Sequence, residues 1–234
     1  MIFIWTVILL VSVLVLYIPV PWIIGRLLRK NQKQKAISKK WIFLTFDDGP
    51  GNRLTPQILK ILSENDIKAT FFLLGRNIAG RETIVHAIQD QKHTIASHSH
   101  SHSHAWKVAP WQALFDIKNG WDAINNVLSD NKKQVAYRPP CGKLNLLTFA
   151  YLMLKKIPIV FWTVDCLDTR PEDIRDLKCA AQRIQTDGGG IVLFHDFDRA
   201  TASTDDYVLD SLKAVIDTAK KINLKFVTIE SLFS

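Results

Sequence analysis

The amino terminus of the chain lacks charge. Residues 1–25 carry no charged side chain, and residues 1–40 include no Asp or Glu. An uncharged apolar run of this length matches the roughly 20 residues that a helix needs to cross a bilayer. The run also lacks the basic start and the A-x-A-like cleavage site of a removable signal peptide. We therefore expect residues 1–25 to form an uncleaved transmembrane helix.

Acidic residues are also missing from residues 26–40, and most of the net charge of +8 lies in this segment. Seven of the 30 Lys and Arg residues lie in residues 26–40, and the rest of the chain is almost neutral. This distribution excludes a broad basic face for nucleic acid and favours a basic juxtamembrane linker over residues 26–40. By the positive-inside rule, the same flank favours a single-pass protein of the cell membrane whose folded domain faces the cytosol.

The patterns of cysteine and glycine exclude two further kinds of binding site. The three cysteines, Cys141, Cys166 and Cys179, are odd in number and lack the spacing of a metal site, as expected for thiols in a reducing compartment. The loop "DDGPGNR" after the first strand-like run has neither the dinucleotide-binding nor the phosphate-loop spacing of glycines. No nucleotide site is therefore expected at this turn.

From residue 41 onward, apolar strands alternate with amphipathic helices. There is no second domain and no repeat beyond this alternation, so residues 41–234 are expected to form one domain. The alternation indicates a parallel sheet, either closed as a barrel or open and doubly wound. The expected strands are residues 41–46, 69–75, 93–97, 134–138, 158–165, 189–196 and 225–229. The expected helices are residues 54–65, 82–91, 110–129, 145–156, 171–185 and 206–222.

Polar residues follow the expected strands at the points where the strands end. They are Asp47, Asp48, His98, Arg138, Asp165, Asp168, His195 and Asp196. In a β/α barrel the carboxyl ends of the strands share one rim, so residues that are distant in the sequence converge there. We therefore expect a catalytic site at this rim.

Four histidines stand at alternate positions in one stretch: His98, His100, His102 and His104. A strand would present all four on one face. A helix would place His98 and His102 on one face and His100 and His104 on the opposite face. Each pair is a possible metal-ligand pair, and geometry alone does not choose between them.

Five short motifs together resemble the NodB-homology polysaccharide deacetylases, also called carbohydrate esterase family 4. They are "TFDDGP", "HSHSH" (98–102), "RPPCG" (138–142), "VDCLD" (164–168) and "LFH" (193–195), in the order and approximate spacing of that family. The resemblance extends from about residue 41 to residue 233, and the expected fold is a distorted (β/α) barrel of about seven parallel strands. The stretch "KHTIASHSHSH" is similar to the family pattern "GHEIGNHTxSH", which places the ligand histidines at His98 and His102.

The resemblance implies a hydrolase that removes the N-acetyl group from an amino sugar with one divalent metal ion, commonly zinc. The metal ligands would be Asp48, His98 and His102, which leave an open position for water and substrate. The membrane anchor favours a substrate in a membrane-associated or cell-envelope glycan or a glycolipid. The alternatives are a deformylase or other amide hydrolase acting on a lipid-linked sugar, and a non-catalytic sugar-binding domain.

The resemblance also implies catalytic roles for four residues. Asp47 would be the base that accepts a proton from water, and Arg138 would hold it in place. His195 would be the acid that protonates the leaving amine, and Asp168 would orient it.

The substrate wall departs from the family pattern. The resemblance implies that the backbone N–H of Cys141 stabilises the oxyanion and that Leu193 lines the acetyl pocket. Cys141 stands where the family usually has tyrosine, and Thr169 stands in place of the tryptophan of "DxxDW". We expect both changes to alter substrate fit more than metal binding. Candidates for a replacement stacking surface are Trp106, Trp111 and Trp162.

Overall fold

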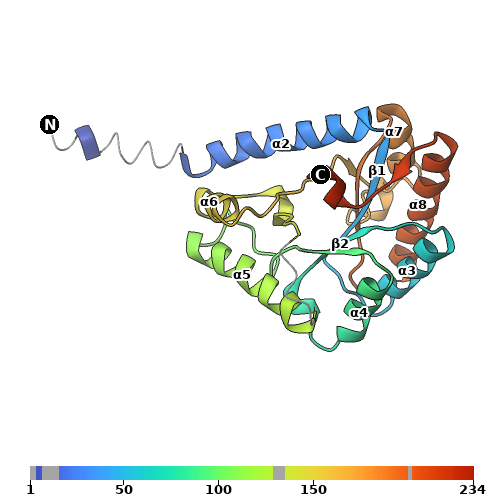
Figure 1. The fold of residues 1–234 in the computed structure, drawn as a ribbon, viewed down its shortest axis with the longest axis horizontal. Helices are drawn as coiled ribbons and strands as arrows, with labels where there is room; N and C mark the ends of the chain where they lie inside the picture. Colours follow the sequence, from blue (N-terminus) through green and yellow to red (C-terminus); the bar gives the residue numbers. More distant parts are fainter. Residues whose placement is uncertain (1–3, 7–15, 129–134, 200–201) are drawn as a thin grey trace.

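The computed structural model of the chain describes residues 4–6, 16–128, 135–199 and 202–234. Its centre is a parallel sheet surrounded by helices, and one long helix runs along the side of the domain toward the amino terminus (Figure 1). The predicted α/β fold with parallel strands is therefore confirmed.

Six strands are present among the described residues, and all their pairings are parallel. They are β1 (Trp41–Asp47), β2 (Thr70–Leu73), β3 (Thr94–Ser97), β4 (Val164–Asp165), β5 (Gly190–His195) and β6 (Lys225–Phe226). The order is β3-β2-β1-β5-β4, and β6 pairs with the start of β1. Tyr137 bridges Ser97 on one side and Ile159 on the other. Because Ile159 belongs to the segment that leads into β4, the pairings close a ring.

The expected strand at residues 134–138 was wrong in extent. Residue 134 lies outside the described residues, and of the others only Tyr137 makes bridges. Pro139 and Pro140 follow at once, and proline has no amide hydrogen to donate to a neighbouring strand. The segment therefore ends its pairing after one residue and turns.

The expected strand at residues 158–165 is also shorter, because a helix side chain takes up its backbone groups. Gln32 Nε2 donates to the Ile159 carbonyl oxygen at 2.7 Å, and the Phe161 amide donates to Gln32 Oε1 at 3.0 Å. The amide side chain of Gln32 thus forms the hydrogen bonds that the backbone of a neighbouring strand would otherwise form at this edge. Regular pairing resumes only at β4.

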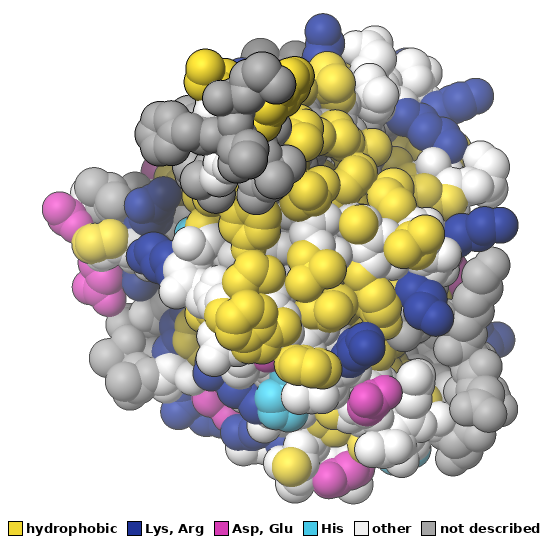
Figure 2. Space-filling view, turned by 90° about the vertical axis from the view of Figure 1, so that its left-hand side faces the viewer, with side chains coloured by type: hydrophobic (Ala, Val, Ile, Leu, Met, Phe, Trp, Pro, Cys, Tyr) yellow, Lys and Arg dark blue, Asp and Glu magenta, His cyan; other side chains and the backbone are white. Residues whose placement is uncertain are grey.

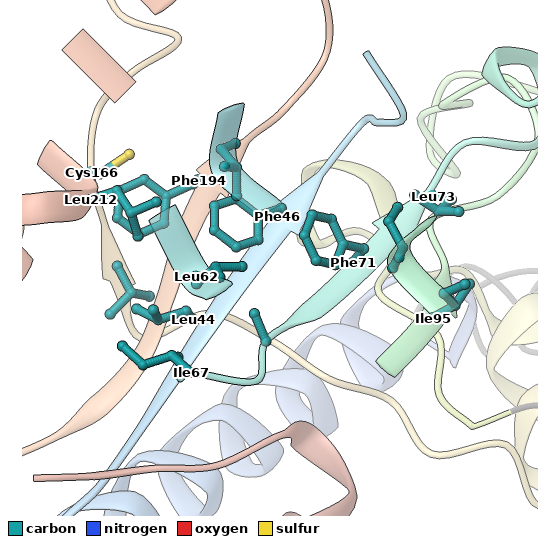
Figure 3. Close-up of a cluster of buried hydrophobic side chains, with 14 of the residues drawn as sticks. Leu44, Phe46, Leu62, Ile67, Phe71, Leu73, Ile95, Cys166, Phe194 and Leu212 are labelled. Atoms are coloured by element: carbon teal, nitrogen blue, oxygen red, sulfur yellow. The ribbon is translucent and has the colours of Figure 1, made fainter. Parts of the chain in front are cut away.

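The alternation of side chains along the strands separates two apolar layers. The inner layer fills the ring and includes Phe43, Phe72, Ala96, Ala136, Val160 and Ile191. The outer layer packs under the helices, and Figure 3 shows Phe46 between Phe71 and Phe194, with ring centroids 4.9 and 5.5 Å away. Since Phe43 points inward, Asp47, four residues later, also points into the ring, at its carboxyl end.

Six helices surround the sheet in the part of the chain that the structure describes. They are α3 (Leu54–Glu64), α4 (Glu82–Asp90), α5 (Pro110–Val127), α6 (Leu146–Leu154), α7 (Cys179–Asp187) and α8 (Ala202–Lys221). The helix expected from residue 171 begins only at Cys179, because Glu172–Ile174 form a separate 3-10 helix and the Asp176 carboxylate accepts the Lys178 amide at 2.8 Å in the turn that follows. Helices α5 and α6 lie together at one end of the domain, below the amino-terminal part of α2 (Figure 1).

Helix α2 (Pro19–Ser38) runs across the predicted boundary between anchor and linker. Its second half packs on the domain: Gln32 and Ala36 are buried, and Lys33 pairs with Asp187 at 2.7 Å. Most of the expected linker is therefore a packed helix. No helix among the described residues is long and apolar enough to span a bilayer; residues 1–3 and 7–15 of the predicted anchor lie outside the described part.

Candidate active site

The predicted site residues meet at the carboxyl ends of the strands. Asp47 ends β1 and His195 ends β5, and the two are register partners. His98 directly follows β3, Arg138 follows the Tyr137 bridge, and Asp168 follows β4. The parallel sheet therefore brings residues from distant parts of the sequence to one rim.

The two adjacent aspartates enter different surroundings. Asp47 continues the alternation of β1 and is 1% exposed inside the ring. Asp48 has a positive φ of 69°, a conformation that Asp adopts more readily than most residues, and this turns its side chain out of the strand pattern. Its Oδ1 atom is buried and accepts no hydrogen bond from the described residues. That oxygen is thus available to a ligand.

The histidine stretch is neither a strand nor a helix. Residues 98–104 form an irregular loop, in which Ser99 and His102 have positive φ angles of 74° and 62°. This turn places the His98 and His102 rings 5.0 Å apart, centroid to centroid. The pair favoured by the family resemblance is therefore the pair that the loop brings together.

The other two histidines of the stretch lie elsewhere. His100 Nδ1 would be 2.7 Å from a Cβ at Gly75, so the ring packs in the space that this glycine leaves. The His104 ring contacts the edge of Trp106, with centroids 5.9 Å apart. Neither histidine belongs to the group with ligand geometry that the described residues contain, Asp48, His98 and His102.

Asp116 of α5 holds the loop, and it was not predicted from the sequence. Its carboxylate accepts hydrogen bonds from the Ser101 amide at 2.8 Å, the Ser101 hydroxyl and the Ser103 amide at 3.0 Å. Burial raises the pKa of Asp116, but these hydrogen bonds outweigh burial and lower the pKa overall. A signal existed, because Asp116 falls between the buried Ala113 and Gly120 on the inward face of the helix.

The three-residue group fits a divalent metal ion. His98 Nε2 and His102 Nε2 lie 3.5 and 3.6 Å from Asp48 Oδ1. Two ligand atoms about 2.1 Å from a tetrahedral zinc ion would be about 3.4 Å apart. His98 Nδ1 lies 2.8 Å from the Arg138 carbonyl oxygen, which can only accept, so Nδ1 carries the hydrogen and Nε2 keeps its lone pair. Burial lowers the pKa of His98 to about 3, so the ring is neutral at pH 7.

Asp47 lies beside the metal group, bound to arginine. Arg138 Nη1 donates to Asp47 Oδ1 at 2.7 Å and to the Thr45 hydroxyl at 2.8 Å, and its guanidinium lies 4.0 Å from the centroid of the Phe72 ring. Burial raises the pKa of Asp47, and Arg138 opposes this rise. The free oxygen, Oδ2, is 3.7 Å from His98 Nε2 and faces the metal group. This carboxylate can accept a proton from a water molecule held there.

His195 lies on the other side of the site in a carboxylate cradle. The Asp168 carboxylate accepts both the His195 Nδ1–H and the His195 amide at 2.8 Å, and Arg199 Nη2 donates to it at 3.2 Å. Burial lowers the pKa of His195, but Asp168 outweighs it, with help from Asp47, and raises the pKa to about 9. The ring is therefore a cation at pH 7 and can donate a proton. Arg199 was not predicted from the sequence.

Two cavities adjoin the rim. One of about 280 Å³ is lined by Asp48, His102 and Phe197, among others. The other, of about 190 Å³, is lined by Cys141 and by residues of α2. The Cys141 side chain is exposed, whereas Leu193 is buried on the inner face, beside Thr45 in the register. Trp106 and Trp162 line the second cavity, and Trp111 is exposed on α5.

Comparison with protein families matches residues 34–160 to the polysaccharide deacetylase family. The match covers more than half of the chain. The chain belongs to the polysaccharide deacetylase family. The resemblance that the five motifs carry is therefore confirmed.

Two curated relatives of the chain are named peptidoglycan deacetylases. The chain is 31% identical over 207 residues to the peptidoglycan-N-acetylglucosamine deacetylase PgdA of Listeria monocytogenes, covering 85% of this chain and 40% of that protein. It is 26% identical over 190 residues to the peptidoglycan-N-acetylmuramic acid deacetylase PdaA of Bacillus subtilis, covering 79% of this chain and 71% of that protein. The chain thus spans less than half the length of the Listeria relative.

Solved structures of the polysaccharide deacetylase family include active and inactive members. The Bc1960 peptidoglycan N-acetylglucosamine deacetylase superposes with a TM-score of 0.73 at 28% identity, covering 83% of this chain and 88% of that one. BA3943 of Bacillus anthracis, described as a pseudoenzyme of carbohydrate esterase family 4, has a TM-score of 0.70 at 26% identity, covering 85% and 66%. The fold alone therefore does not decide activity, which depends on the residues and geometry of the site.

Proposed function

We propose that this protein is a metal-dependent hydrolase that removes the N-acetyl group from an amino sugar in a cell-envelope glycan or a glycolipid. One observation carries the proposal: Asp48, His98 and His102 converge with metal-ligand geometry, and a second carboxylate, Asp47, lies beside them without belonging to the group. The names of the relatives support peptidoglycan as a candidate substrate.

The first half of the reaction is the attack of water on the acetyl carbonyl. A divalent ion held by the three ligands, most commonly zinc, would polarise this carbonyl and lower the pKa of water. Asp47 Oδ2 takes one proton from the attacking water while the water oxygen bonds to the carbonyl carbon. Arg138 fixes the carboxylate through its 2.7 Å hydrogen bond, and burial strengthens Asp47 as a base.

The second half is the departure of the amine. The C–N bond breaks, the bonding pair stays on nitrogen, and His195 donates its proton there, so the products are acetate and the free amino sugar. Asp168 keeps the imidazole charged and oriented for this step. In the same proposal the Cys141 N–H donates to the oxyanion, and the buried Leu193 forms the wall for the acetyl methyl group.

A non-catalytic sugar-binding domain is the second candidate. It is favoured by the departures at Cys141 and Thr169, which remove two aromatic side chains of the family pattern, and by the existence of a related pseudoenzyme. Against it, the metal group, the Asp47–Arg138 pair and the Asp168–His195 pair are all assembled. A deformylase acting on a lipid-linked sugar would use the same residues.

Membrane attachment through residues 1–25 is part of the proposal. Large hydrophobic side chains are exposed on α2 (Trp22, Ile23, Leu27), α5 (Trp111, Phe115) and α6 (Leu147, Met153, Leu154). Figure 2 shows the side of the molecule that carries the amino-terminal end: hydrophobic side chains fill the middle of this face, and Lys and Arg stand near its margin. A bilayer surface suits such a face. The basic flank favours the cytosolic side, which a carboxyl-terminal reporter fusion would test.

An assay of released acid tests the activity. The full chain, purified in detergent and loaded with zinc, is incubated with peptidoglycan, chitin oligomers and lipid-linked amino sugars in N-acetyl and N-formyl forms, and acetate and formate are both measured. We expect acetate from at least one substrate and none after Asp47→Asn. Formate without acetate would establish the deformylase. A metal-loaded protein that binds glycans and releases neither acid would establish the sugar-binding domain.

A further inference from the structure

A second polar site lies beside the rim, between α2 and the turn at Cys141. The cavity of about 190 Å³ takes Trp22, Arg26 and Arg29 from α2 and Lys143 and Trp162 from the domain. The charged side chains that line it are all cations and stand beside aromatic rings, whereas the cavity on the Asp48 side combines the carboxylates of Asp48 and Asp198 with Arg76 and Arg81. The two cavities beside the site therefore suit different parts of a substrate.

No carboxylate of the described residues neutralises the cations of this cavity. Among the described residues, Arg26, Arg29 and Lys143 form no ion pair, although Lys33, further along the same helix, pairs with Asp187 at 2.7 Å. Burial and the nearby charge of Arg26 both lower the pKa of Arg29. Unpaired cations held together in this way favour an anionic ligand.

Aromatic rings hold these cations in place. Arg26 lies 4.9 Å from the centroid of the Trp22 ring, Arg29 lies 4.8 Å from Trp162, and Lys143 lies 4.2 Å from Trp106. A guanidinium stacked on a ring keeps its N–H edge free, and that edge matches two oxygens of a phosphate.

Two glycines allow α2 to approach the rim. A Cβ at Gly142 would lie 3.2 Å from both Arg29 Nη2 and the Trp162 ring, and a Cβ at Gly25 would lie 3.1 Å from the Phe161 ring. Gly142 also has a positive φ of 66°. The close contact between α2 and the turn is therefore built into the backbone on both sides.

The cavity lies next to the catalytic rim, because Cys141, which lines it, belongs to the turn shortly after Arg138. Burial lowers the pKa of Arg138, which holds Asp47, and the charge of Arg29 adds to this lowering. Cys141 lines the cavity and also feels the charge of Asp48. A ligand that spans the Cys141 turn can thus place one end among the cations and the other at the metal group.

We propose that this cavity binds the phosphate that links an amino-sugar substrate to its lipid carrier. This inference rests on the proposed deacetylase function and on the position of the cavity, since Arg26 and Arg29 directly follow the uncharged residues 1–25 in the sequence. A phosphate at a bilayer surface would meet Arg26 and Arg29, and the attached sugar would extend over Cys141 to the site.

A matched pair of substrates tests this. N-acetylglucosamine is linked to the same short isoprenoid either through a diphosphate or directly, and acetate release by the full chain is measured in neutral detergent micelles. We expect the diphosphate substrate to have at least a tenfold higher kcat/KM. Arg29→Gln should reduce this preference about tenfold, mainly through KM. Lys30→Gln removes the same charge from the adjacent, exposed position outside the cavity and should keep the preference.

Other results would overturn the inference. Equal kcat/KM values for the two substrates would do so while leaving the deacetylase function intact, as would an equal loss in both variants, which indicates general attraction to charge. Phosphatidylglycerol in the micelles could raise kcat/KM for the phosphate-free substrate as much as the diphosphate link does. In that case the cavity binds free lipid headgroups instead. If no substrate yields acetate, the proposed function fails, and quenching of tryptophan fluorescence by inorganic diphosphate, compared between Arg29→Gln and Lys30→Gln, still tests the cavity.

Discussion

Two histidines of the same rim have opposite electrostatic environments. His98 and His195 are both held through Nδ1 at 2.8 Å, but His98 donates to the neutral carbonyl of Arg138 and His195 donates to the carboxylate of Asp168. Burial lowers the pKa of His98 to about 3, while Asp168 overcomes burial and raises that of His195 to about 9. The partner of the remote ring nitrogen thus decides whether an imidazole is a neutral ligand or an acid.

The difference also divides the site into two halves. On the His98 side, the neutral His98 ring, the His102 ring and the Asp48 oxygen form a group that suits a cation. On the His195 side, a charged ring faces the same space and can deliver a proton. A deacetylase needs both halves, because water must be activated at one end of the amide and nitrogen protonated at the other.

Removal of the ligand half should have the largest effect. We expect His98→Ala to release the metal and to reduce deacetylation about 10³-fold or more, since metal polarisation and water activation are lost together. Metal content after dialysis and acetate release measure the two effects. His100→Ala is the matched control from the same loop and should retain one metal equivalent. Equal metal loss in both variants would show that the assignment of ligands is wrong.

Changing the partner of His195 tests the other half directly. Asp168→Asn keeps a hydrogen-bond acceptor near Nδ1 but removes the charge, so burial should lower the pKa of His195 and leave the ring neutral at pH 7. We expect kcat to fall about 10²-fold while bound metal stays at one equivalent. The measurement is kcat together with metal content. Loss of metal along with activity would mean that the two halves are not separate.

The pH dependence of the wild-type protein follows from the same pair. His195 can act as an acid only when its ring is protonated. The pKa of His195 in the folded protein is raised to about 9, so the ring stays protonated below pH 9 and loses its proton as the pH rises through this value. With saturating metal, kcat should fall above about pH 9. In Asp168→Asn this fall should move to lower pH. A wild-type rate that stays level through pH 10 would exclude His195 as the acid.

The sequence was sufficient to predict the residues of the two halves of the site, but not the contacts that hold these residues in place. Strand ends and motif order placed Asp47, Asp48, Arg138 and His195 at one rim, because register in a parallel sheet is set by alternating apolar residues. The choice between histidine pairs needed the family resemblance, since the loop at residues 98–104 has positive φ angles that no periodicity encodes.

Supporting contacts between distant segments were beyond sequence reasoning. Gln32 replaces a strand at residues 159–161, which turned an expected strand into a splayed segment and an expected linker into a packed helix. Arg199 reaches Asp168 across 31 residues. Such contacts depend on where two elements meet after folding, and the residue pattern of one element does not identify the distant element that it will contact.

The smallest expected effect concerns the support of the ligand half. Asp116 touches neither His98 nor His102 but fixes Ser101 and Ser103 on both sides of His102. Asp116→Asn replaces one acceptor oxygen by a donor, so the loop should loosen and metal affinity should fall about tenfold, as for other residues that orient ligands indirectly. Activity should return at higher zinc concentration with the same kcat. Asp122→Asn, further along α5, is the matched control. A lower kcat at saturating zinc would instead give Asp116 a part in positioning the reacting groups.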